Sequence, residues 1–185
     1  MDRMLSFVNR LRKGATSFIF LGGIHGVGKT TLCEQIFAPA GYHCITASML
    51  IKAYGLKTDQ DKRVGDITDN QTALIEQLRY ERESHNQLLL DGHYCLINNQ
   101  NQFEPIDVEA FRKMNPSVFL LLKGCPKEIK KRLSKRDGKD WNQFFVTQFQ
   151  TAEEKHARCV SSELKIPLKV FMYSTNQQVW SIEDD

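Results

Sequence analysis

The sequence predicts a three-layer α/β domain in which helices cover both faces of a parallel sheet. Apolar runs of strand length recur along the chain, and most are continuous rather than alternating, which is typical of parallel strands buried on both faces. Segments of helical length separate these runs, and such alternation is the pattern of the three-layer α/β class. The five predicted strands are residues 17–21, 43–46, 87–90, 117–122 and 167–173.

Helices are expected between these strands, and the spacing of apolar residues predicts them at residues 29–37, 48–54, 68–84, 107–113, 126–136 and about 141–164. The first dozen residues also form a short basic amphipathic segment, with Met4, Leu5, Val8 and Leu11 on one side. We interpret this segment as a helix that packs over the sheet. The alternative is an anchor for a membrane or a partner protein.

Composition restricts the class of protein further. Of the 185 residues, 41% are hydrophobic and 25% are charged, which excludes fibrous and largely disordered proteins. Because no repeat or linker-like tract interrupts the chain, we expect a single domain over residues 1–185. The formal net charge of +3 is too small to predict a nucleic-acid partner from bulk charge alone.

The cysteines and the amino terminus indicate a cytoplasmic protein. The five cysteines are scattered, without a C-x-x-C pair or a zinc-ligand spacing, so we expect free thiols in a reducing compartment. The first residues lack the apolar core of a secretory signal. No apolar run approaches the roughly 18 residues needed to cross a bilayer.

A phosphate-binding motif follows the first predicted strand directly. Residues 23–30 read GIHGVGKT and fit G-x-x-x-x-G-K-[ST], the Walker A or P-loop pattern, at every fixed position. In such a loop the glycines let backbone N–H groups point at phosphate oxygens, and the following helix adds its positive end. The alternative is a glycine-rich turn without a ligand, which the strand-loop-helix context disfavours.

Each residue of the motif has an expected part in this chemistry. Lys29 is expected to reach the β- and γ-phosphates of a nucleotide, and the Thr30 hydroxyl to bind Mg²⁺. His25 occupies a variable position and is not expected to act as a base. The predicted nucleotide-binding residues are Gly23, His25, Gly26, Val27, Gly28, Lys29, Thr30 and Thr31.

An aspartate follows the third predicted strand, where a parallel sheet presents its carboxyl edge. Asp91 begins the run Asp91-Gly92-His93-Tyr94, and this edge is where a phosphate loop would also lie. We therefore expect Asp91 to hold a Mg²⁺-bound water or to orient a substrate. The alternative is an ordinary Asp-Gly turn.

These motifs resemble the P-loop nucleoside monophosphate kinase superfamily, especially short-lid adenylate-kinase-like proteins. The resemblance rests on FLGGIHGVGKTTL, LLLDGHY, KEIKKRLSKRDGKDW and KIPLKVF, and it spans most of residues 17–173. It implies a P-loop NTPase fold with a five-stranded parallel sheet, an acceptor-binding helical region at about 47–85 and a short lid at about 132–141. It also implies Asp91 as the family's acidic residue.

One departure from the family pattern concerns the acceptor. Many adenylate kinases follow the Asp-Gly pair with Phe-Pro-Arg, whose arginine grips the acceptor phosphate. In this chain the residues are His93, Tyr94 and Cys95, and His93 fits the Asp-Thr-His of archaeal-type enzymes better. The acceptor is therefore left open between a nucleotide and a nucleoside.

The lid region carries the strongest local charge of the chain. Arg132 and Arg136 are four residues apart, so on a helix they share one face and could direct two guanidinium groups at a triphosphate. Such groups neutralise charge on the transferred phosphoryl oxygens. The alternative, a solvated helix face, is accepted for Lys127, Lys130 and Lys131. The segment's basic residues are Lys123, Lys127, Lys130, Lys131, Arg132, Lys135, Arg136 and Lys139.

The remaining helices offer weaker signals. Apolar residues recur at helical spacing from Trp141 to Val160, and His156 on that face is interpreted as a core or boundary residue. Gln148, Gln150 and Glu153 receive no role. On the acceptor side, a base could be recognised by Gln71 and a phosphate held by Lys52 or Arg79, with further polar candidates at Asp66, Asp69 and Asn70.

Together these observations predict a cytoplasmic kinase that uses Mg²⁺ and ATP to phosphorylate a small nucleotide or nucleoside-like acceptor. The expected catalytic residues are Lys29, Asp91, Arg132 and Arg136, and the expected metal-binding residues are Thr30 and Asp91. The expected partners are a nucleoside triphosphate and the acceptor, without a membrane. The alternatives are a nucleotide-gated interaction protein with slow ATPase activity and a kinase that acts on polynucleotide ends.

Overall fold

Strands and helices alternate along the chain in the order that the sequence predicts. The computed structural model describes residues 2–11, 17–53, 65–174 and 179–183. The helices are α1 (Asp2–Leu11), α2 (Lys29–Leu32), the π-helical turn η1 (Cys33–Phe37), α3 (Ala47–Ala53), α4 (Gly65–Ser84), α5 (Val108–Met114), α6 (Pro126–Asp137) and α7 (Gln143–Leu164). The strands are β1 (Ser17–Gly22), β2 (His43–Thr46), β3 (Gln87–Asp91), β4 (Cys95–Ile97), β5 (Phe103–Pro105), β6 (Val118–Gly124), β7 (Leu168–Ser174) and β8 (Val179–Ile182).

The main sheet confirms the predicted class but has one strand more than expected. In the part of the chain that the structure describes, its order is β2-β3-β1-β6-β7-β8. The first five strands are parallel, and they correspond to the five predicted apolar runs. The sixth, β8, pairs antiparallel with β7, so the expectation of a five-stranded sheet was wrong by this edge strand. This strand has only four residues, and Ser181 interrupts its apolar residues, so it is too short for its apolar run to predict a strand.

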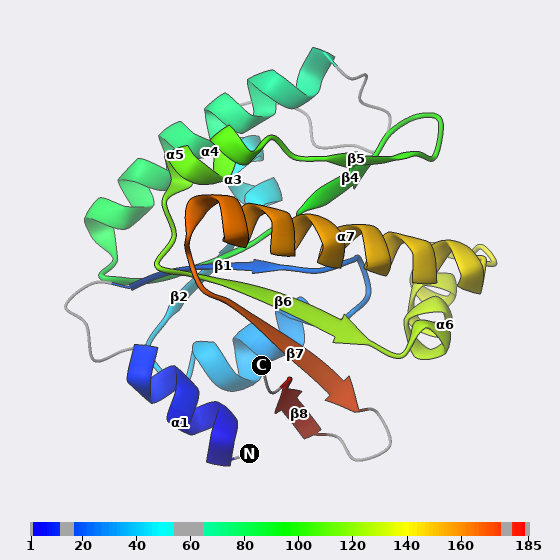
Figure 1. Ribbon diagram of the computed structural model, residues 1–185, viewed down its shortest axis with the longest axis horizontal. Helices are drawn as coiled ribbons and strands as arrows, with labels where there is room; N and C mark the ends of the chain where they lie inside the picture. Colours follow the sequence, from blue (N-terminus) through cyan, green and yellow to red (C-terminus); the bar gives the residue numbers. More distant parts are fainter. Residues whose placement is uncertain (1, 12–16, 54–64, 175–178, 184–185) are drawn as a thin grey trace.

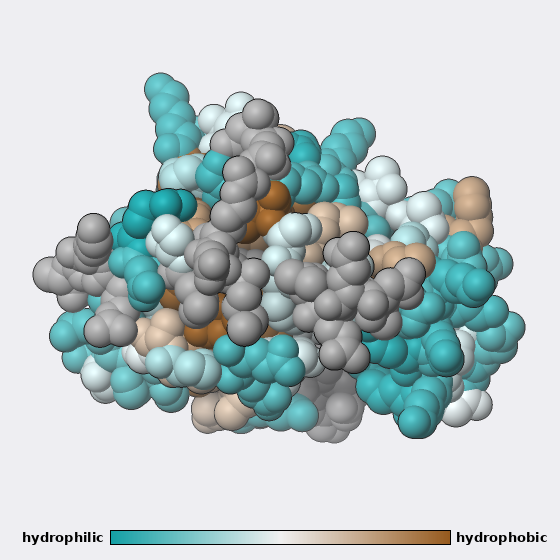
Figure 2. Space-filling model, turned by 90° about the horizontal axis from the view of Figure 1, so that it is seen from below, coloured by the Kyte–Doolittle hydropathy of each residue, from teal (hydrophilic) through white to brown (hydrophobic). Residues whose placement is uncertain are grey.

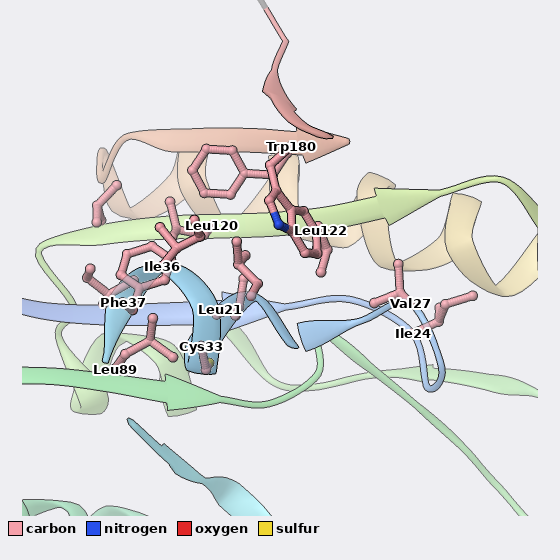
Figure 3. Packing of buried hydrophobic residues seen from close by; sticks show 14 of the residues in the cluster. Leu21, Ile24, Val27, Cys33, Ile36, Phe37, Leu89, Leu120, Leu122 and Trp180 are labelled. Atoms are coloured by element: carbon pink, nitrogen blue, oxygen red, sulfur yellow. The ribbon is translucent and has the colours of Figure 1, made fainter. Parts of the chain in front are cut away.

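Both faces of the sheet are buried, as the continuous apolar runs predicted. Along β1, Phe18 and Phe20 enter one cluster, while Ile19 and Leu21 enter the other. The first cluster is covered by α3, α4, α5 and the carboxyl half of α7. The second is covered by α1, α2, η1 and α6, and Figure 3 shows its packing around Leu21 and Leu120. Figure 1 shows the resulting layers, with α4, α5 and α7 on one side and α1 on the other.

The amino-terminal segment packs on the sheet, in agreement with the prediction. Val8 is fully buried and Phe7 is nearly so. The Phe7 ring meets Phe171 of β7 edge to face, with 5.6 Å between ring centroids. The side chains of Met4 and Leu5 lie outside the described residues. Among the helices described, none is long and apolar enough to cross a membrane.

A short hairpin of β4 and β5 was not predicted. Cys95 pairs with Pro105 and Ile97 with Phe103, and a loop at residues 98–102 joins the two strands. Asn98 shapes that loop, because its side-chain oxygen accepts the backbone N–H groups of Gln100 and Gln102 at 3.0 and 2.9 Å. Strands of three residues with mixed polarity give no clear period, which explains the omission.

The free thiols that the sequence predicts are confirmed, since all five cysteines are unbridged. The surface seen from below is mostly hydrophilic, and the hydrophobic residues, coloured brown, gather near the middle of the view (Figure 2).

The sheet order places β1 between β3 and β6, so the carboxyl ends of these strands meet at one edge. Leu21 lies opposite Asp91 in the β1–β3 register, and the loop after β1 therefore begins beside that aspartate.

Candidate functional site

The loop between β1 and α2 has the backbone of a phosphate-binding turn. Gly23, Gly26 and Gly28 have φ angles of 142°, 72° and 113°, a region that side chains with a Cβ rarely enter. At Gly23 a Cβ would also stand 2.6 Å from the Leu122 carbonyl oxygen of β6. The loop therefore requires glycine at these places, and it leads straight into α2 at Lys29.

Lys29 is buried inside this loop. Its Nζ donates to the Gly23 carbonyl at 2.6 Å and lies 3.4 Å from the Ile24 carbonyl. The same ammonium is 3.6 Å from Asp91 Oδ1 at the end of β3. Burial raises the pKa of the Asp91 carboxyl above its ordinary value, and the Lys29 charge opposes that rise. The structure thus brings together two residues that the sequence separates by 62 positions, the interval from 29 to 91.

A cleft of about 1220 Å³ opens above this pair. The predicted residues His25, Gly26, Gly28, Lys29, Thr30, Thr31, Asp91, Arg132 and Arg136 all line it. Gly23 and Val27 are outside the described lining residues, and the Val27 side chain is fully buried in the core (Figure 3). Val27 can therefore contribute to a ligand only through its backbone.

The two arginines of α6 face different partners. Arg132 Nε donates to the Gly26 carbonyl of the loop at 2.8 Å, which ties α6 to the phosphate loop. Arg136 forms a two-pronged pair with the adjacent Asp137, at 2.6 Å and 3.1 Å. This arginine holds the pKa of Asp137 below its ordinary value. Both arginines line the cleft, and of the two only Arg132 has a described hydrogen bond to the loop.

A tight turn joins α6 to α7 at the expected place of the lid. The helix ends at Asp137, and Gly138 adopts the left-handed conformation with φ 65°. Trp141 closes the turn, because its indole N–H donates to Asp137 at 3.0 Å and its backbone N–H donates to Ser134 at 3.1 Å. Lys139 lies over the Trp141 ring, 4.7 Å from its centroid. The connection is short, at residues 138–142.

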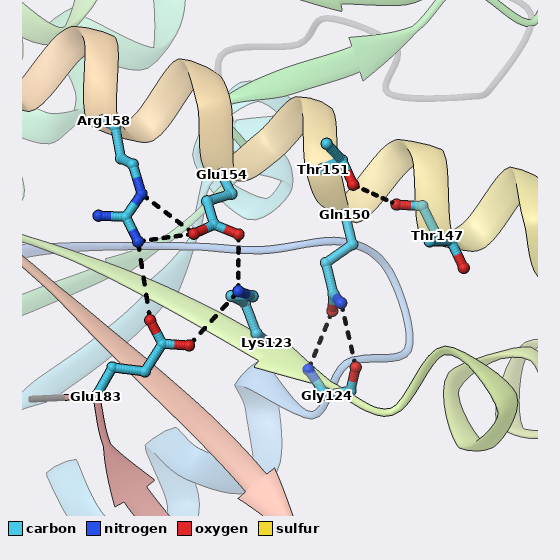
Figure 4. Close-up of polar contacts among 8 residues, drawn as sticks. All are labelled: Lys123, Gly124, Thr147, Gln150, Thr151, Glu154, Arg158 and Glu183. Carbon is cyan, nitrogen blue, oxygen red and sulfur yellow. Dashed lines mark hydrogen bonds and ion pairs between the residues drawn. The ribbon is translucent and has the colours of Figure 1, made fainter.

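Part of the basic segment is occupied elsewhere. Lys123 pairs with Glu154 at 2.7 Å and lies 3.5 Å from Glu183, while Arg158 also binds Glu154 at 2.7 Å (Figure 4). Gln150 binds the backbone of Gly124 through both its amide atoms, at 3.0 and 3.2 Å. These contacts fasten the end of β6 to α7. Gln150, to which the sequence gave no role, is therefore a connecting residue of the frame around the site.

Glu153 is the main functional candidate that sequence reasoning missed. It is fully buried, and its carboxylate accepts the Tyr94 backbone N–H at 2.8 Å and contacts His93 Nδ1 at 2.8 Å. Burial raises the pKa of Glu153 to about 7, against the opposing effect of the Tyr94 N–H. Burial also lowers the pKa of His93 well below its ordinary value, and Lys29 adds to this effect.

The contacts of Glu153 with His93 and Tyr94, which we call the Glu153 bridge, hold the residues that follow Asp91 in place. The His93 ring in turn meets the His25 ring of the phosphate loop, with 4.2 Å between ring centroids. A signal was present in the sequence: Phe149, Glu153 and Ala157 follow one another at intervals of four, which places a carboxylate on the apolar face of α7. His156, by contrast, is a boundary residue as expected, bonded to the Ile106 carbonyl at 2.6 Å.

The acceptor-side candidates differ in their position relative to the cleft. Gln71 lines the cleft, and its Oε1 atom is buried without a hydrogen-bond partner. Lys52 and Arg79 are exposed and are not among the described lining residues. Residues 54–64, and the side chains of Asp66, Asp69 and Asn70, lie outside the described part of the chain. Further polar groups come from the hairpin loop, where Asn98, Asn99 and Asn101 line the cleft.

Comparison with curated proteins gives a relative with the expected kinase character. Over 118 residues the chain is 26% identical to a protein of Methanocaldococcus jannaschii that is provisionally named an adenylate kinase. The match covers 64% of this chain and 58% of that protein, so the chain spans little more than half the length of this relative. This confirms the resemblance to adenylate-kinase-like proteins that the motifs predict.

Comparison with solved structures gives distant likenesses. A gluconokinase from Sinorhizobium meliloti has a TM-score of 0.46 at 16% identity, covering 84% of this chain and 83% of that one. A shikimate kinase from Bacteroides thetaiotaomicron has a TM-score of 0.47 at 19% identity, covering 82% and 84%. A tunicamycin resistance protein from Deinococcus radiodurans has a TM-score of 0.47 at 17% identity, covering 82% and 96%.

A family match settles the membership of the chain. The AAA domain family matches residues 22–143, which begin at the end of β1 and include the phosphate loop, Asp91 and both arginines of α6. This range is more than half of the chain. The protein therefore belongs to the AAA domain family.

Proposed function

We propose that this protein is a small-molecule kinase that transfers the γ-phosphoryl group of Mg-ATP to a nucleotide or nucleoside-like acceptor. The observation that carries the proposal is the convergence of four elements on one cleft: the phosphate loop, Lys29, Asp91 and the arginines of α6. The resemblance to a provisionally named adenylate kinase supports the same reaction class. A single domain over residues 1–185 remains part of the proposal.

The donor half of the cleft would hold the triphosphate. The backbone of residues 23–30 and the start of α2 supply N–H groups, and Lys29 would exchange its bond with the Gly23 carbonyl for phosphate oxygens. Thr30 and Asp91 supply hydroxyl and carboxylate oxygens, the ligands that Mg²⁺ prefers. Bound there, Mg²⁺ would neutralise charge on the phosphate oxygens. Arg132 and Arg136, which line the same cleft, would add positive charge.

In the transfer step, a hydroxyl or phosphate oxygen of the acceptor forms a new bond to the γ-phosphorus, and a hydroxyl acceptor releases its proton to solvent. The bond from that phosphorus to the bridging oxygen breaks, and ADP leaves. The protein contributes alignment and charge, because this reaction asks little covalent chemistry of it. Asp91 lines the cleft, where it would orient the acceptor or a metal-bound water.

The acceptor half of the cleft favours a neutral, hydrogen-bonding molecule such as a nucleoside. The polar side chains that β2, α3, α4 and the hairpin loop contribute to the described lining are uncharged, and they are those of Thr46, Ser48, Gln71, Asn98, Asn99 and Asn101. The described cations of the lining, Lys29, Arg132, Arg136 and Lys139, belong to the phosphate loop and the lid. Gln71 Oε1, buried without a partner, would accept a hydrogen bond from an acceptor N–H or O–H.

A transfer assay with Mg-ATP and a panel of nucleosides, nucleoside monophosphates and oligonucleotides tests the proposal. We expect a phosphorylated small acceptor to form together with ADP, and Lys29→Ala to reduce the rate at least about 10³-fold. Lys131→Ala is the matched control, since Lys131 is an exposed lysine of α6 outside the described cleft lining. Release of inorganic phosphate alone, with every acceptor, would identify a nucleotide-gated switch instead. Labelled oligonucleotide ends would identify a polynucleotide kinase.

A further inference from the structure

Three side chains of types that bind metals converge outside the described lining of the cleft. His43 is the first residue of β2, Glu81 lies in the last turn of α4, and His85 directly follows the last residue of that helix. Glu81 Oε2 is 3.3 Å from His43 Nε2 and 3.7 Å from His85 Nε2. One ligand atom from each residue lies within 4.8 Å of the other two. Two imidazoles and a carboxylate therefore surround one point.

The fold explains why these three donors meet. Glu81 and His85 are four residues apart, so they share one face of the helical turn at the end of α4. His43 comes from the neighbouring edge strand, where it pairs with Leu88 of β3, just after His85. The two imidazole rings stack in parallel, with 3.8 Å between centroids and 10° between planes. The cluster thus joins an edge strand to a helix end.

We propose that His43, Glu81 and His85 bind a divalent transition-metal ion of the zinc class, with water completing the coordination. Imidazole nitrogens suit Zn²⁺, Co²⁺, Ni²⁺ and Cu²⁺, whereas Mg²⁺ and Ca²⁺ prefer oxygen ligands. Zinc bonds of roughly 2.0–2.2 Å in a tetrahedron bring ligand atoms to about 3.4 Å from one another. The ligand atoms here all lie within 4.8 Å of one another, so binding needs only a small closure.

The surroundings of the cluster allow an ion to enter and the three side chains to close around it. The side chains of His43, Glu81 and His85 are 40%, 27% and 38% exposed, so an ion can reach them and their rotamers can adjust. The site is separate from the proposed catalytic metal site. His43 lies at the opposite end of β2 from Thr46, which lines the cleft, and three strand residues span about 10 Å. A metal here would clamp β2 to α4, the helix that carries Gln71.

Titration of the protein over residues 1–185 with ZnCl₂ by calorimetry, in a reducing and non-chelating buffer, tests the site. We expect the wild type to bind one ion per chain. The dissociation constant should be at least about tenfold larger in each of His43→Ala, Glu81→Gln and His85→Ala. Glu83→Gln is the matched control, because Glu83 is an exposed carboxylate of the same helical turn. Equal zinc affinity in the wild type and all three variants would overturn the proposal, as would no binding by the wild type.

Two further measurements distinguish zinc binding at this site from a folding defect in the variants and from zinc binding to cysteine thiols. At 100-fold excess over its dissociation constant, zinc should raise the Tm of the wild type by about 5 °C or more, and that of His85→Ala by less. Cys125 and Cys159 are exposed and could also bind zinc. Co²⁺ at the proposed site should show visible bands without a thiolate charge-transfer band. A thiolate band that persists in the His85→Ala variant would assign the binding to cysteine and reject the site.

Discussion

The phosphate loop and the Glu153 bridge support the same edge of the sheet in contrasting ways. The loop is a continuous stretch, residues 23–30, whose conformation follows from its own glycines and from the strand before it. The bridge joins Glu153 of α7 to His93 and Tyr94, which are 60 and 59 positions away. The loop is local and lines the cleft, whereas the bridge is long-range and centres on the fully buried Glu153.

This difference separates two kinds of contribution to a site. The loop supplies the groups that would touch a phosphate, so changes in it should act on turnover. The bridge holds the backbone just after Asp91 and the ring that meets His25, so changes in it should act on stability and on the placement of those groups. Variants in the two regions should therefore separate loss of activity from loss of folding free energy.

The largest effect on folding is expected at Glu153. Glu153→Ala removes the acceptor for the Tyr94 N–H and the partner of His93, and it leaves a buried cavity. We expect a loss of about 3 kcal/mol in the free energy of unfolding, measured by denaturant titration. Glu153→Gln keeps an acceptor for Tyr94 and a donor for His93, so it should cost under about 1 kcal/mol. Similar losses in both variants would show that the charge, rather than the hydrogen bonds, matters.

The two arginines of α6 lie on one helix face, and their variants can be compared directly. Arg132 already contacts the loop, whereas Arg136 is held by Asp137 and must leave it to reach a phosphate. In the phosphate-transfer assay, Arg132→Ala should lower kcat/KM by about 10²-fold, and Arg136→Ala by only about tenfold. Both variants should keep the wild-type Tm within a few degrees, because both side chains are partly or fully exposed.

The reverse order would contradict this assignment of roles. A larger effect at Arg136 would mean that the lid opens the Arg136–Asp137 pair when a nucleotide binds. In that case Asp137→Asn, which weakens the pair, should increase kcat/KM. Lys131→Ala again serves as the control on the exposed face of the same helix.

Sequence reasoning located the parts of the site whose determinants are short-range. The loop motif, the strand before it and the carboxylate after β3 are each readable within about ten residues, and the parallel-strand rule then brings Lys29 and Asp91 to one edge. The spacing of Arg132 and Arg136 likewise placed both at the cleft.

What was missed depends on contacts between distant segments. Glu153 becomes significant only when α7 crosses the end of β3, and Gln150 only when it meets Gly124. The edge strand β8 and the hairpin of β4 and β5 are held by pairing and by single contacts such as Trp180 on Tyr173, with 4.3 Å between ring centroids. Their three or four residues carry too little periodicity to predict them.

The smallest expected effect, a change in pH dependence, isolates the charge of Glu153. Burial raises the pKa of this carboxyl from 4.5 to about 7, so the folded state holds its proton more tightly than the unfolded state does. The resulting stabilisation is present at low pH and is lost as the pH rises through about 7. Glu153→Gln cannot ionise and does not undergo this loss.

The stability difference between the wild type and Glu153→Gln should therefore shift by about 1 kcal/mol in favour of the variant between roughly pH 6 and pH 8. Taking the difference at each pH removes the contributions of groups that both proteins share. Glu163→Gln is the matched control, since Glu163 is an exposed carboxylate of the same helix, and it should show no such shift. A difference that stays constant over this range would mean that Glu153 remains ionised when buried. The Tyr94 N–H and a protonated His93 would then outweigh its desolvation.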